Sequence, residues 1–338
     1  MLSSIGKSSA LAGLRPGKDE TEPMEPTELD KANLRVDVLY GGWSAEREVS
    51  LATGEACAQA LARAGFSRVE LVDVTPEIGK VMEERKPQVV FNGLHGKWGE
   101  DGHIQAILEM LRIPYTHSGV LASSLAMHKQ KAKVIFRDAR IPTAESKLVS
   151  IERLMDSDPM PMPYVVKPVA EGSSVGVHIV ESEASSPVSV SLSGIGEYGQ
   201  ELMVERFVPG RELTCAVMGN VALGVLDIEA KGSFYNYESK YAEGGSEHIV
   251  PADIPNEVYR KIQQYSLAAH MSLGCKGVTR ADFRYDDTPG ADGELVILEI
   301  NTQPGMTGTS LVPEIAQHAG HSFEELVEWM VKDASCDR

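Results

Sequence analysis

The chain has 338 residues, of which 42% are hydrophobic and 24% charged, and its 32 basic against 49 acidic residues give a net charge of −17. This composition is ordinary for a soluble globular protein with room for two or three domains. Nucleic acids and anionic membranes bind basic surfaces, and no stretch approaches the ~20 apolar residues of a membrane span, so neither partner is expected.

The four cysteines lie far apart and form no CxxC pair; they are Cys57, Cys215, Cys275 and Cys336. A disulfide framework is implausible at this length, and no zinc or iron–sulfur spacing is present. Buried thiols of a cytoplasmic protein are therefore expected.

Residues 1–33 are rich in Ser, Gly and Ala and then in acids and prolines, without hydrophobic periodicity or a signal-peptide core. They are expected to form a disordered leader.

Strands and helices alternate between residues 34 and 117. Apolar runs at 34–40, at 69–74 and in QVVFNGL predict strands, with a helix to about residue 63 and another at 78–85 between them. This alternation favours a parallel sheet, with GGWSAE and HGKWGEDG beyond the carboxyl ends of its strands. Ser44 is a good helix N-cap. Glu46 is open to two interpretations: a simple cap, or a carboxylate that faces the ammonium group of a ligand.

Residues 122–139 have the pattern of one basic amphipathic helix, whose charges are usually a solvated face. Lys167 follows in the apolar strand of PYVVKP, where an unpaired ammonium group would be costly. A phosphate partner is therefore indicated. The next loop, AEGSSVG, lacks the GK[ST] ending of a Walker motif, but its glycines and serines could present N–H and hydroxyl donors to phosphate.

Residues 233–252 contain four aromatic residues and form either a mobile lid or a loosely packed surface loop. An amphipathic helix is predicted at 254–273. Another is predicted at 323–332, with Ser322 as its N-cap.

Two predicted strands flank the turn TPGADGE and carry oxygen-bearing side chains. Successive strand residues alternate between faces, so Arg280 shares a face with Asp282, and Glu299 shares one with Asn301. Asp282, Glu299 and Asn301 could converge as oxygen ligands, which favours magnesium over zinc. The alternative is an edge hairpin with solvated acids. The loop TQPGMTGTS that follows is rich enough in backbone donors for an anionic substrate.

Seven motifs occur in order: GGWSAEREVS, HGKWGEDG, YTHSGVLAS, VVKPVAEGSSVGV, FYNYESKY, GCKGVTRADF and LEINTQPGMTGTSLVP. Together they resemble the motifs of the D-alanine–D-alanine ligases, members of the ATP-grasp superfamily, over about residues 34–332. The resemblance implies an α/β and α+β chain, in which an ATP-grasp fold is preceded by an N-terminal parallel-sheet α/β domain. The implied parts are the N-terminal substrate domain at 34–117, the central ATP-grasp subdomain at 118–206 and the C-terminal subdomain at 207–338, with a lid at 233–252.

The resemblance also implies roles for individual residues. Those expected to bind ATP are Lys129, Lys167, Glu205, Arg206, Phe207, Val208, Glu212 and Lys240. Those expected to hold two Mg²⁺ or Mn²⁺ ions are Asp282, Glu299 and Asn301. Glu46 is expected to hold the ammonium group of the first D-alanine near His95, with Ser173 and Tyr241 as its hydrogen-bonded partners. Arg280 and the Gly305 N–H are the expected oxyanion donors, and Ser310 and Leu311 are expected beside the second D-alanine.

The implied activity is ATP-dependent ligation of two D-alanines through an acyl phosphate, for peptidoglycan precursor synthesis, by a cytoplasmic homodimer. Tyr241 favours a D-amino acid acceptor, because the related D-lactate ligases usually carry phenylalanine at that position. His128 departs from the family, in which an acid commonly precedes the lysine at position 129. The alternatives are a ligase with another amino or hydroxy acid acceptor and a catalytically silent nucleotide-binding protein. Retention of the metal ligands, both lysines and Arg280 disfavours the silent protein.

Overall fold

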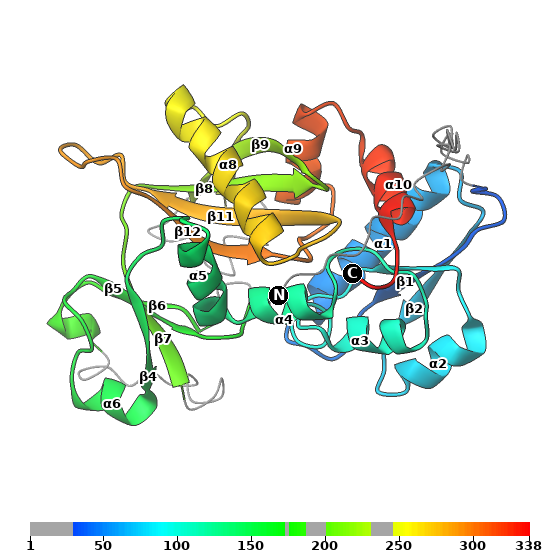
Figure 1. Ribbon diagram of the computed structural model, residues 1–338, viewed down its shortest axis with the longest axis horizontal. Coiled ribbons are helices and arrows are strands. Elements are labelled where there is room, and N and C mark those ends of the chain that lie inside the picture. The colour runs from blue at the N-terminus through cyan, green and yellow to red at the C-terminus, as the bar shows by residue number, and fades with distance from the viewer. Residues whose placement is uncertain (1–29, 173–175, 187–200, 231–245) are drawn as a thin grey trace, which may run out of the picture. The chain divides into compact units, whose positions relative to one another are not determined.

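The computed structural model describes residues 30–172, 176–186, 201–230 and 246–338 (Figure 1). Its contacts group residues 31–338 into one unit, separate from residues 1–30. Residues 1–29 of the expected leader and residues 233–245 of the expected lid (233–252) lie outside the described residues. Within the rest of the expected lid, Ser246–Ile249 form a strand. Lys31 already belongs to the larger unit, because its ammonium group pairs with Glu328 at 2.7 Å. Within the described ranges, no helix is both long and apolar enough to cross a membrane.

The first sheet has three parallel strands in the order β2–β1–β3, which confirms the predicted parallel sheet. Its strands are β1 (Arg35–Tyr40), β2 (Arg68–Asp73) and β3 (Val89–Asn92), and its helices are α1 (Arg47–Arg63), α2 (Ile78–Arg85) and α3 (His103–Met110). The loops after β1 and β3 contain GGWSAE and HGKWGEDG and therefore lie at the carboxyl edge of this sheet.

The start of α1 differs from the sequence prediction. Ser44 is not the N-cap, because the helix begins only at Arg47 and the Ser44 hydroxyl instead donates to the backbone oxygen of His95 (2.8 Å). Glu46 occupies the N-cap position but makes no side-chain capping hydrogen bond. The interpretation of Glu46 as a simple cap is therefore wrong, and its carboxylate is directed elsewhere.

The second sheet is antiparallel, in the order β4–β7–β5–β6, and consists of β4 (Ser146–Ser150), β5 (Tyr164–Pro168), β6 (His178–Val180) and β7 (Glu201–Arg206). The helix α6 (Ile151–Asp156) and a short 3₁₀ turn, η1 (Glu183–Ser185), accompany it. Side chains of all four strands, among them Tyr164 and Val204, form its small core together with Leu154 of α6.

The single helix predicted at 122–139 is wrong. The chain forms α4 (Val120–Met127) and α5 (Lys129–Asp138), with a break at His128. His128 leaves helical geometry with a ψ of 88°, and its side chain accepts a hydrogen bond from the Lys131 N–H, which caps α5. The residue that departs from the family pattern therefore begins the helix that carries Lys129.

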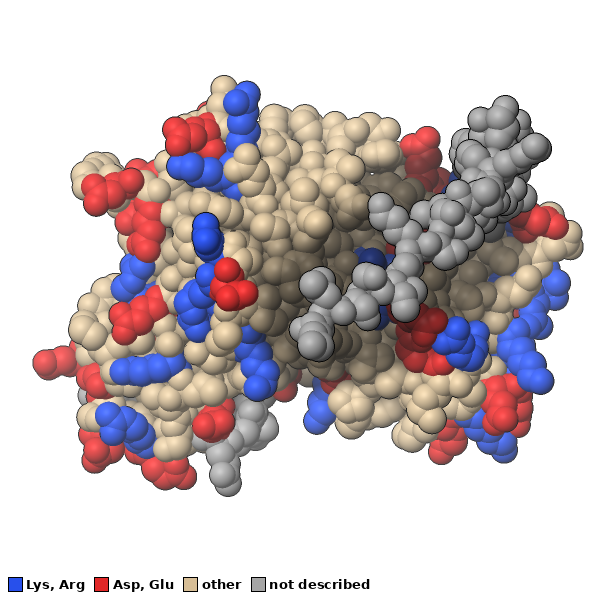
Figure 2. Space-filling view, viewed as in Figure 1, with Lys and Arg blue, Asp and Glu red and all other residues tan. Residues whose placement is uncertain are grey.

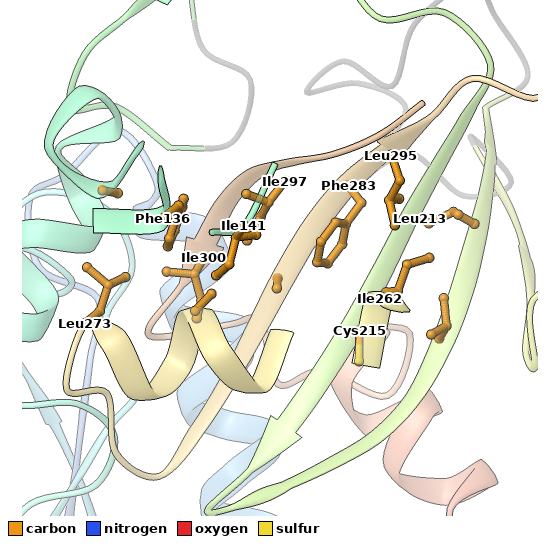
Figure 3. Close-up of a cluster of buried hydrophobic side chains, with 14 of the residues drawn as sticks. Phe136, Ile141, Leu213, Cys215, Ile262, Leu273, Phe283, Leu295, Ile297 and Ile300 are labelled. Atoms are coloured by element: carbon orange, nitrogen blue, oxygen red, sulfur yellow. The ribbon is translucent and has the colours of Figure 1, made fainter. Parts of the chain in front are cut away.

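The third sheet is antiparallel in the order β10–β9–β8–β11–β12 and has α8 (Asn256–Ser272) on one face, which confirms the helix predicted at 254–273 (Figure 1). Its strands are β8 (Arg211–Met218), β9 (Val221–Ala230), β10 (Ser246–Ile249), β11 (Val278–Tyr285) and β12 (Leu295–Asn301). Leu213, Cys215, Phe283 and Ile297 pack in one buried cluster with Ile262 of α8 (Figure 3). Because strand residues alternate between faces, the polar residues between them point to the opposite face.

Two helices complete the chain. The helix α9 (Leu311–His318), which the sequence analysis did not predict, follows the glycine-rich loop after β12. The helix α10 (Phe323–Asp333) confirms the last prediction: the Ser322 side chain accepts from the Glu325 N–H, and Glu325 in turn accepts from the Ser322 N–H. On the face drawn in Figure 2, the described Lys and Arg side chains are interspersed with Asp and Glu, so charges of both signs share this surface.

His117 is a buried imidazole in the connection before α4, where its backbone φ is 69°. Its ring meets Phe91 edge-on, with 6.0 Å between the ring centroids. Neither ring nitrogen makes a well-formed hydrogen bond within the described part of the chain. Burial lowers the pKa of His117 to about 3, and the Val278 backbone offsets only part of this effect.

This imidazole predicts a loss of stability in mild acid. Below pH 6.5 the unfolded chain takes up a proton at His117, whereas the folded chain does so only near pH 3. The free energy of unfolding should therefore fall by about 2 kcal/mol between pH 6.5 and pH 5 through this group alone. His117→Asn, which tolerates a positive φ, should lose this share of the pH dependence in urea unfolding. His318→Asn, at an exposed position, should keep this pH dependence. If the free energy of unfolding changed with pH equally in wild type and His117→Asn, the expectation would be contradicted.

Candidate active site

An open cavity lies between the second and third sheets. It is lined from α5, β5 and β7 on one side and from β8, β11 and β12 on the other. Nine residues predicted to bind ATP or metal line it: Lys129, Lys167, Glu205, Arg206, Phe207, Val208, Glu212, Asp282 and Glu299. Lys240, the remaining predicted ATP contact, lies outside the described residues.

The two lysines of the cavity already have protein partners. Lys129 Nζ lies 3.0 Å from Glu299 Oε2 and donates to the Glu171 backbone oxygen at 2.6 Å. Lys167 Nζ lies 2.5 Å from Glu205 Oε2. Burial alone would lower the pKa of Lys167, but the Glu205 carboxylate raises it above its ordinary value. Lys167 is therefore an ammonium group whose burial is compensated inside the protein, and its phosphate partner stays a prediction.

Asp282 is the centre of a polar cluster on the open face of the third sheet. Arg280 donates to both of its oxygens, from Nε at 2.9 Å and from Nη2 at 2.8 Å. The Thr214 hydroxyl donates to Oδ1 at 2.7 Å, and the Asn301 amide donates to Oδ2 at 3.0 Å. In the strand register Asp282 lies opposite Glu299, and Arg280 lies opposite Asn301. The strands thus bring the three predicted metal ligands together.

The donor set of this cluster fits a hard cation. Asp282 and Glu299 supply carboxylate oxygens and Asn301 supplies an amide oxygen, which are groups that Mg²⁺ and Mn²⁺ prefer. Among the described residues there is no group of three or more His, Cys, Asp or Glu side chains arranged for a metal. An ion here would thus be held by two carboxylates and an amide, and by the phosphates of a bound nucleotide. The alternative of solvated acids is wrong for Asp282, which is buried, although β12 is an edge strand.

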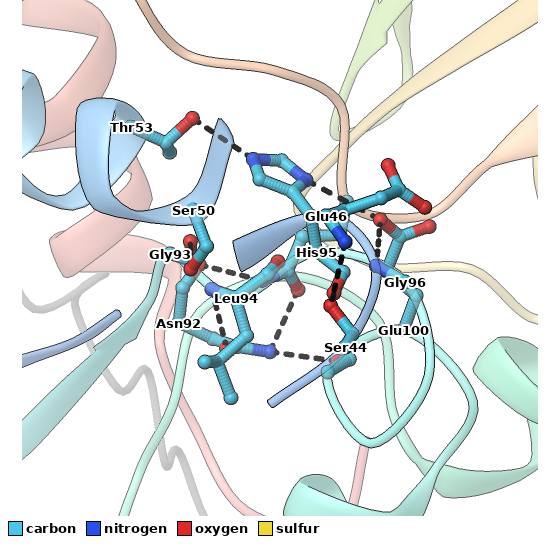
Figure 4. A network of polar contacts seen from close by, with 12 residues as sticks. Ser44, Glu46, Ser50, Thr53, Asn92, Gly93, Leu94, His95, Gly96 and Glu100 are labelled. Atoms are coloured by element: carbon cyan, nitrogen blue, oxygen red, sulfur yellow. Dashed lines mark hydrogen bonds and ion pairs between the residues drawn. The ribbon is translucent and has the colours of Figure 1, made fainter. Parts of the chain in front are cut away.

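A second polar group lies at the carboxyl edge of the first sheet (Figure 4). His95 is buried there, with Nε2 2.9 Å from the Thr53 hydroxyl and Nδ1 3.3 Å from Glu100 Oε1. Glu100 also accepts from the Gly96 N–H at 2.9 Å. Both ring nitrogens of His95 therefore have protein partners that fix its orientation.

Glu46 is buried between two glycine-containing loops. A Cβ atom at Gly96, in HGKWGEDG, would lie 2.8 Å from Glu46 Oε1, and one at Gly172, in AEGSSVG, would lie 2.7 Å from it. Only glycine leaves room for the carboxylate at both positions. Glu46 thus lies where the loop of the first sheet meets the loop beside the cavity. Ser173 and Tyr241, its predicted neighbours, lie outside the described residues.

The loop after β12 carries the remaining predicted residues. The Ser310 hydroxyl accepts from the Thr307 N–H at 2.9 Å, and a Cβ at Gly305 would lie 3.0 Å from Ser310 Oγ. Leu311 is buried at the start of α9. The loop is therefore folded tightly on itself, beside the cluster that Arg280 and Asn301 form.

Gln303, which joins this loop to the first sheet, was not predicted from the sequence. Gln303 is buried and donates to the backbone oxygens of Asn92 and Leu94, both at 2.8 Å, and accepts from the Asn92 side chain at 2.7 Å. Its only sequence signal is a polar side chain two residues after Asn301 in NTQPG. Lys133 and Thr53 were also missed, because their partners, Glu205 and His95, are distant in sequence. Glu100 was missed although its partners His95 and Gly96 lie in the same loop.

Two family models match the chain. The model described as the D-ala D-ala ligase N-terminus matches residues 74–118, and the one described as the D-ala D-ala ligase C-terminus matches residues 135–332. A D-alanine–D-alanine ligase of Methylorubrum extorquens is 56% identical over 304 residues, which are 90% of this chain and 99% of that protein. The chain belongs to the D-alanine–D-alanine ligase family. A ligase B of Mesorhizobium japonicum is 58% identical over 90% of the chain and 98% of its own length.

A solved member of the ligase family has the same fold. The D-alanine–D-alanine ligase of Bacillus anthracis, in a crystal structure with ATP, superimposes with a TM-score of 0.73 at 29% identity and covers 89% of this chain and 96% of that one. The predicted ATP-grasp fold class is thereby confirmed. The roles of the individual residues described above remain predictions.

Proposed function

We propose that this chain joins two D-alanine molecules to D-alanyl-D-alanine, with conversion of ATP to ADP and phosphate, for peptidoglycan precursor synthesis. The observation that carries the proposal is the convergence of Lys129, Lys167, Asp282 and Glu299 on one cavity beside Arg280. Such a cavity suits a triphosphate at the point where a carboxylate has to be activated.

The carboxylate of the first D-alanine is activated in the cavity. A carboxylate does not react with an amine because its leaving group would be oxide. An oxygen of the first D-alanine carboxylate attacks the γ-phosphorus of ATP, ADP leaves, and an acyl phosphate results. Lys129 and Lys167 hold the phosphates, while the segment from Glu205 to Val208 and Glu212 hold the nucleoside. Asp282, Glu299 and Asn301 would hold the divalent ions, which neutralise charge on the phosphoryl oxygens when bound.

Peptide-bond formation follows beside the same cavity. Glu46 binds the ammonium group of the first D-alanine, with His95 held next to it by Thr53 and Glu100. The amine of the second D-alanine, held near Ser310 and Leu311, attacks the acyl carbon, and phosphate leaves. Arg280 and the Gly305 N–H stabilise the tetrahedral oxyanion, each such donor being worth about 3–4 kcal/mol. The enzyme is further proposed, from the resemblance to its family, to act in the cytoplasm as a homodimer.

Phosphate release is the direct test of this function. Purified protein with ATP and Mg²⁺ should release phosphate only when D-alanine is present, with one dipeptide formed per phosphate. Absence of D-alanine-dependent release would contradict the proposal. Release that depends on another amino or hydroxy acid would support a ligase with a different substrate. Release without any acceptor would favour an ATPase.

The position of Glu46 gives a prediction for the first substrate. Gly172→Ala would bring a Cβ atom within 2.7 Å of Glu46 Oε1, which must then move. Because the flexible end of a side chain can shift at little cost to the fold, stability should be unchanged. The KM for D-alanine should rise about tenfold or more through the misplaced carboxylate. Gly79→Ala, whose Cβ would meet only Ile107 at 3.9 Å, is the matched control and should behave as wild type. An unchanged KM for D-alanine in Gly172→Ala would contradict the proposal that Glu46 binds the first D-alanine.

A further inference from the structure

Lys133 carries a charge that the proposed mechanism does not use. It lies on α5 four residues after Lys129, so the two side chains share one face of the helix. Lys129 lines the cavity, whereas the Lys133 side chain is completely buried and does not line it. Lys133 therefore has no direct access to a nucleotide in the cavity.

The partner of Lys133 is the carboxylate of Glu205. Lys133 Nζ forms an ion pair with Glu205 Oε1, and the other oxygen, Oε2, lies 2.5 Å from Lys167 Nζ. Apart from that ion pair, neither Lys133 Nζ nor Glu205 Oε1 has a hydrogen-bond partner within the described residues. Burial alone would raise the pKa of Glu205, but the two ammonium groups lower it below its ordinary value. At Lys133 burial outweighs the Glu205 carboxylate and lowers the pKa of the lysine, while the close ion pair with Glu205 Oε1 favours the ammonium form. One ionised carboxylate therefore bridges two ammonium groups, with one oxygen for each.

The charge balance shows what Lys133 adds. Glu205 and Lys167 alone would form a neutral pair, and the positive charge of Lys167 would be cancelled at the cavity wall. With Lys133 the group has a net charge of +1, and only Lys167 of the two ammonium groups reaches the cavity. We propose that Lys133 is a positioning residue for the nucleotide: it neutralises one oxygen of Glu205, so that Glu205 orients Lys167 without cancelling its charge. This inference rests on the proposed function, because it takes the phosphates of ATP as the anion that benefits.

Stability alone gives a poor reason for this arrangement. Buried ion pairs are often no more stabilising than well-packed apolar residues of similar volume, since both charges lose their hydration. An apolar side chain at position 133 of α5 could fill the same space against β7. An anionic ligand next to Lys167, in contrast, gains when the positive charge of Lys167 is not cancelled by Glu205 at short range in a water-poor environment.

The test measures ATP affinity directly. Lys133→Met removes the charge, and Lys133→Gln removes it while keeping an N–H donor for Glu205 Oε1. Both variants should raise the Kd for ATP with Mg²⁺, measured by calorimetry, about tenfold or more, because Lys167 is then drawn toward Glu205. The KM for D-alanine should stay within about twofold of wild type. Lys131→Met, on the exposed side of the same helix, is the matched control and should bind ATP normally.

A double variant separates positioning from general damage to the fold. In a Glu205→Gln background no carboxylate remains to be neutralised, so adding Lys133→Met should no longer weaken ATP binding. A folded Lys133→Gln or Lys133→Met variant with wild-type ATP affinity and a lower unfolding temperature would show a purely structural role and overturn the inference. Additive losses in the double variant would overturn it as well. Wild-type protein without D-alanine-dependent phosphate release would instead contradict the proposed function, and the ATP binding data would still decide the role of Lys133.

Discussion

Replacement of Arg280 with methionine should lower kcat for dipeptide formation by about 10³-fold, since loss of one donor to a developing oxyanion has an effect of this size. Arg280 lies on the open face of β11 and is held by two hydrogen bonds to Asp282, opposite Asn301 of β12. Its guanidinium group is thus fixed before substrate binds. Dipeptide formation and phosphate release are measured together, so that uncoupled ATP hydrolysis would be detected.

Two further variants define what Arg280 contributes. Arg280→Lys keeps the charge but loses the fork of donors, and should recover only part of the activity. Arg260→Met, at an exposed position of α8, should leave kcat unchanged. A loss of less than about tenfold in Arg280→Met would mean that another group stabilises the oxyanion.

Replacement of Asp282 with asparagine should lower kcat/KM by about 10³-fold, because the stabilisation of phosphoryl charge by a bound ion is worth several kcal/mol. The substitution preserves the volume of the side chain in the cluster with Arg280, Thr214 and Asn301. It removes one of the two carboxylates that are proposed to hold the ion. The Mg²⁺ concentration for half-maximal ATP binding should rise, and this can be read by calorimetry without turnover.

Asp292→Asn is the control for this variant. It lies at an exposed position in the turn between the same two strands and should bind Mg²⁺ and ATP as wild type does. One contradicting result would be a loss of activity in Asp282→Asn while its ATP binding kept the Mg²⁺ dependence of wild type. The carboxylate would then orient Arg280 rather than bind the ion, and the assignment of the metal site would be wrong.

The open face of the third sheet was predictable because it depends on local alternation. Phe283 and Leu213 are apolar and pack against α8, so Asp282 and Glu212 point to the other side. The same rule placed Glu299 and Asn301 on one face of their strand. The broken helix at His128 was not predictable, because it requires ψ to leave the helical range at one residue inside a sequence with good helical pattern.

Partners that are distant in sequence account for the rest. A buried Lys167 indicated a compensating anion, and phosphate stays a prediction for it, but its protein partner Glu205, 38 residues later, has no local signal in the sequence. Gln303 and Asn92 are separated by 211 residues, so the contact between the glycine-rich loop and the first sheet has no local signal. Composition and periodicity cannot identify such pairs, whereas the order of seven motifs could identify the family that contains them.

This cavity is proposed to activate the carboxylate of D-alanine by phosphorylation before the amine attacks. D-Alanine labelled with ¹⁸O in both carboxyl oxygens tests this proposal in one experiment with ATP and Mg²⁺. Attack of the carboxylate on the γ-phosphorus transfers one labelled oxygen, so the released phosphate should contain one ¹⁸O atom for each dipeptide formed. Phosphate without label alongside dipeptide formation would contradict the account.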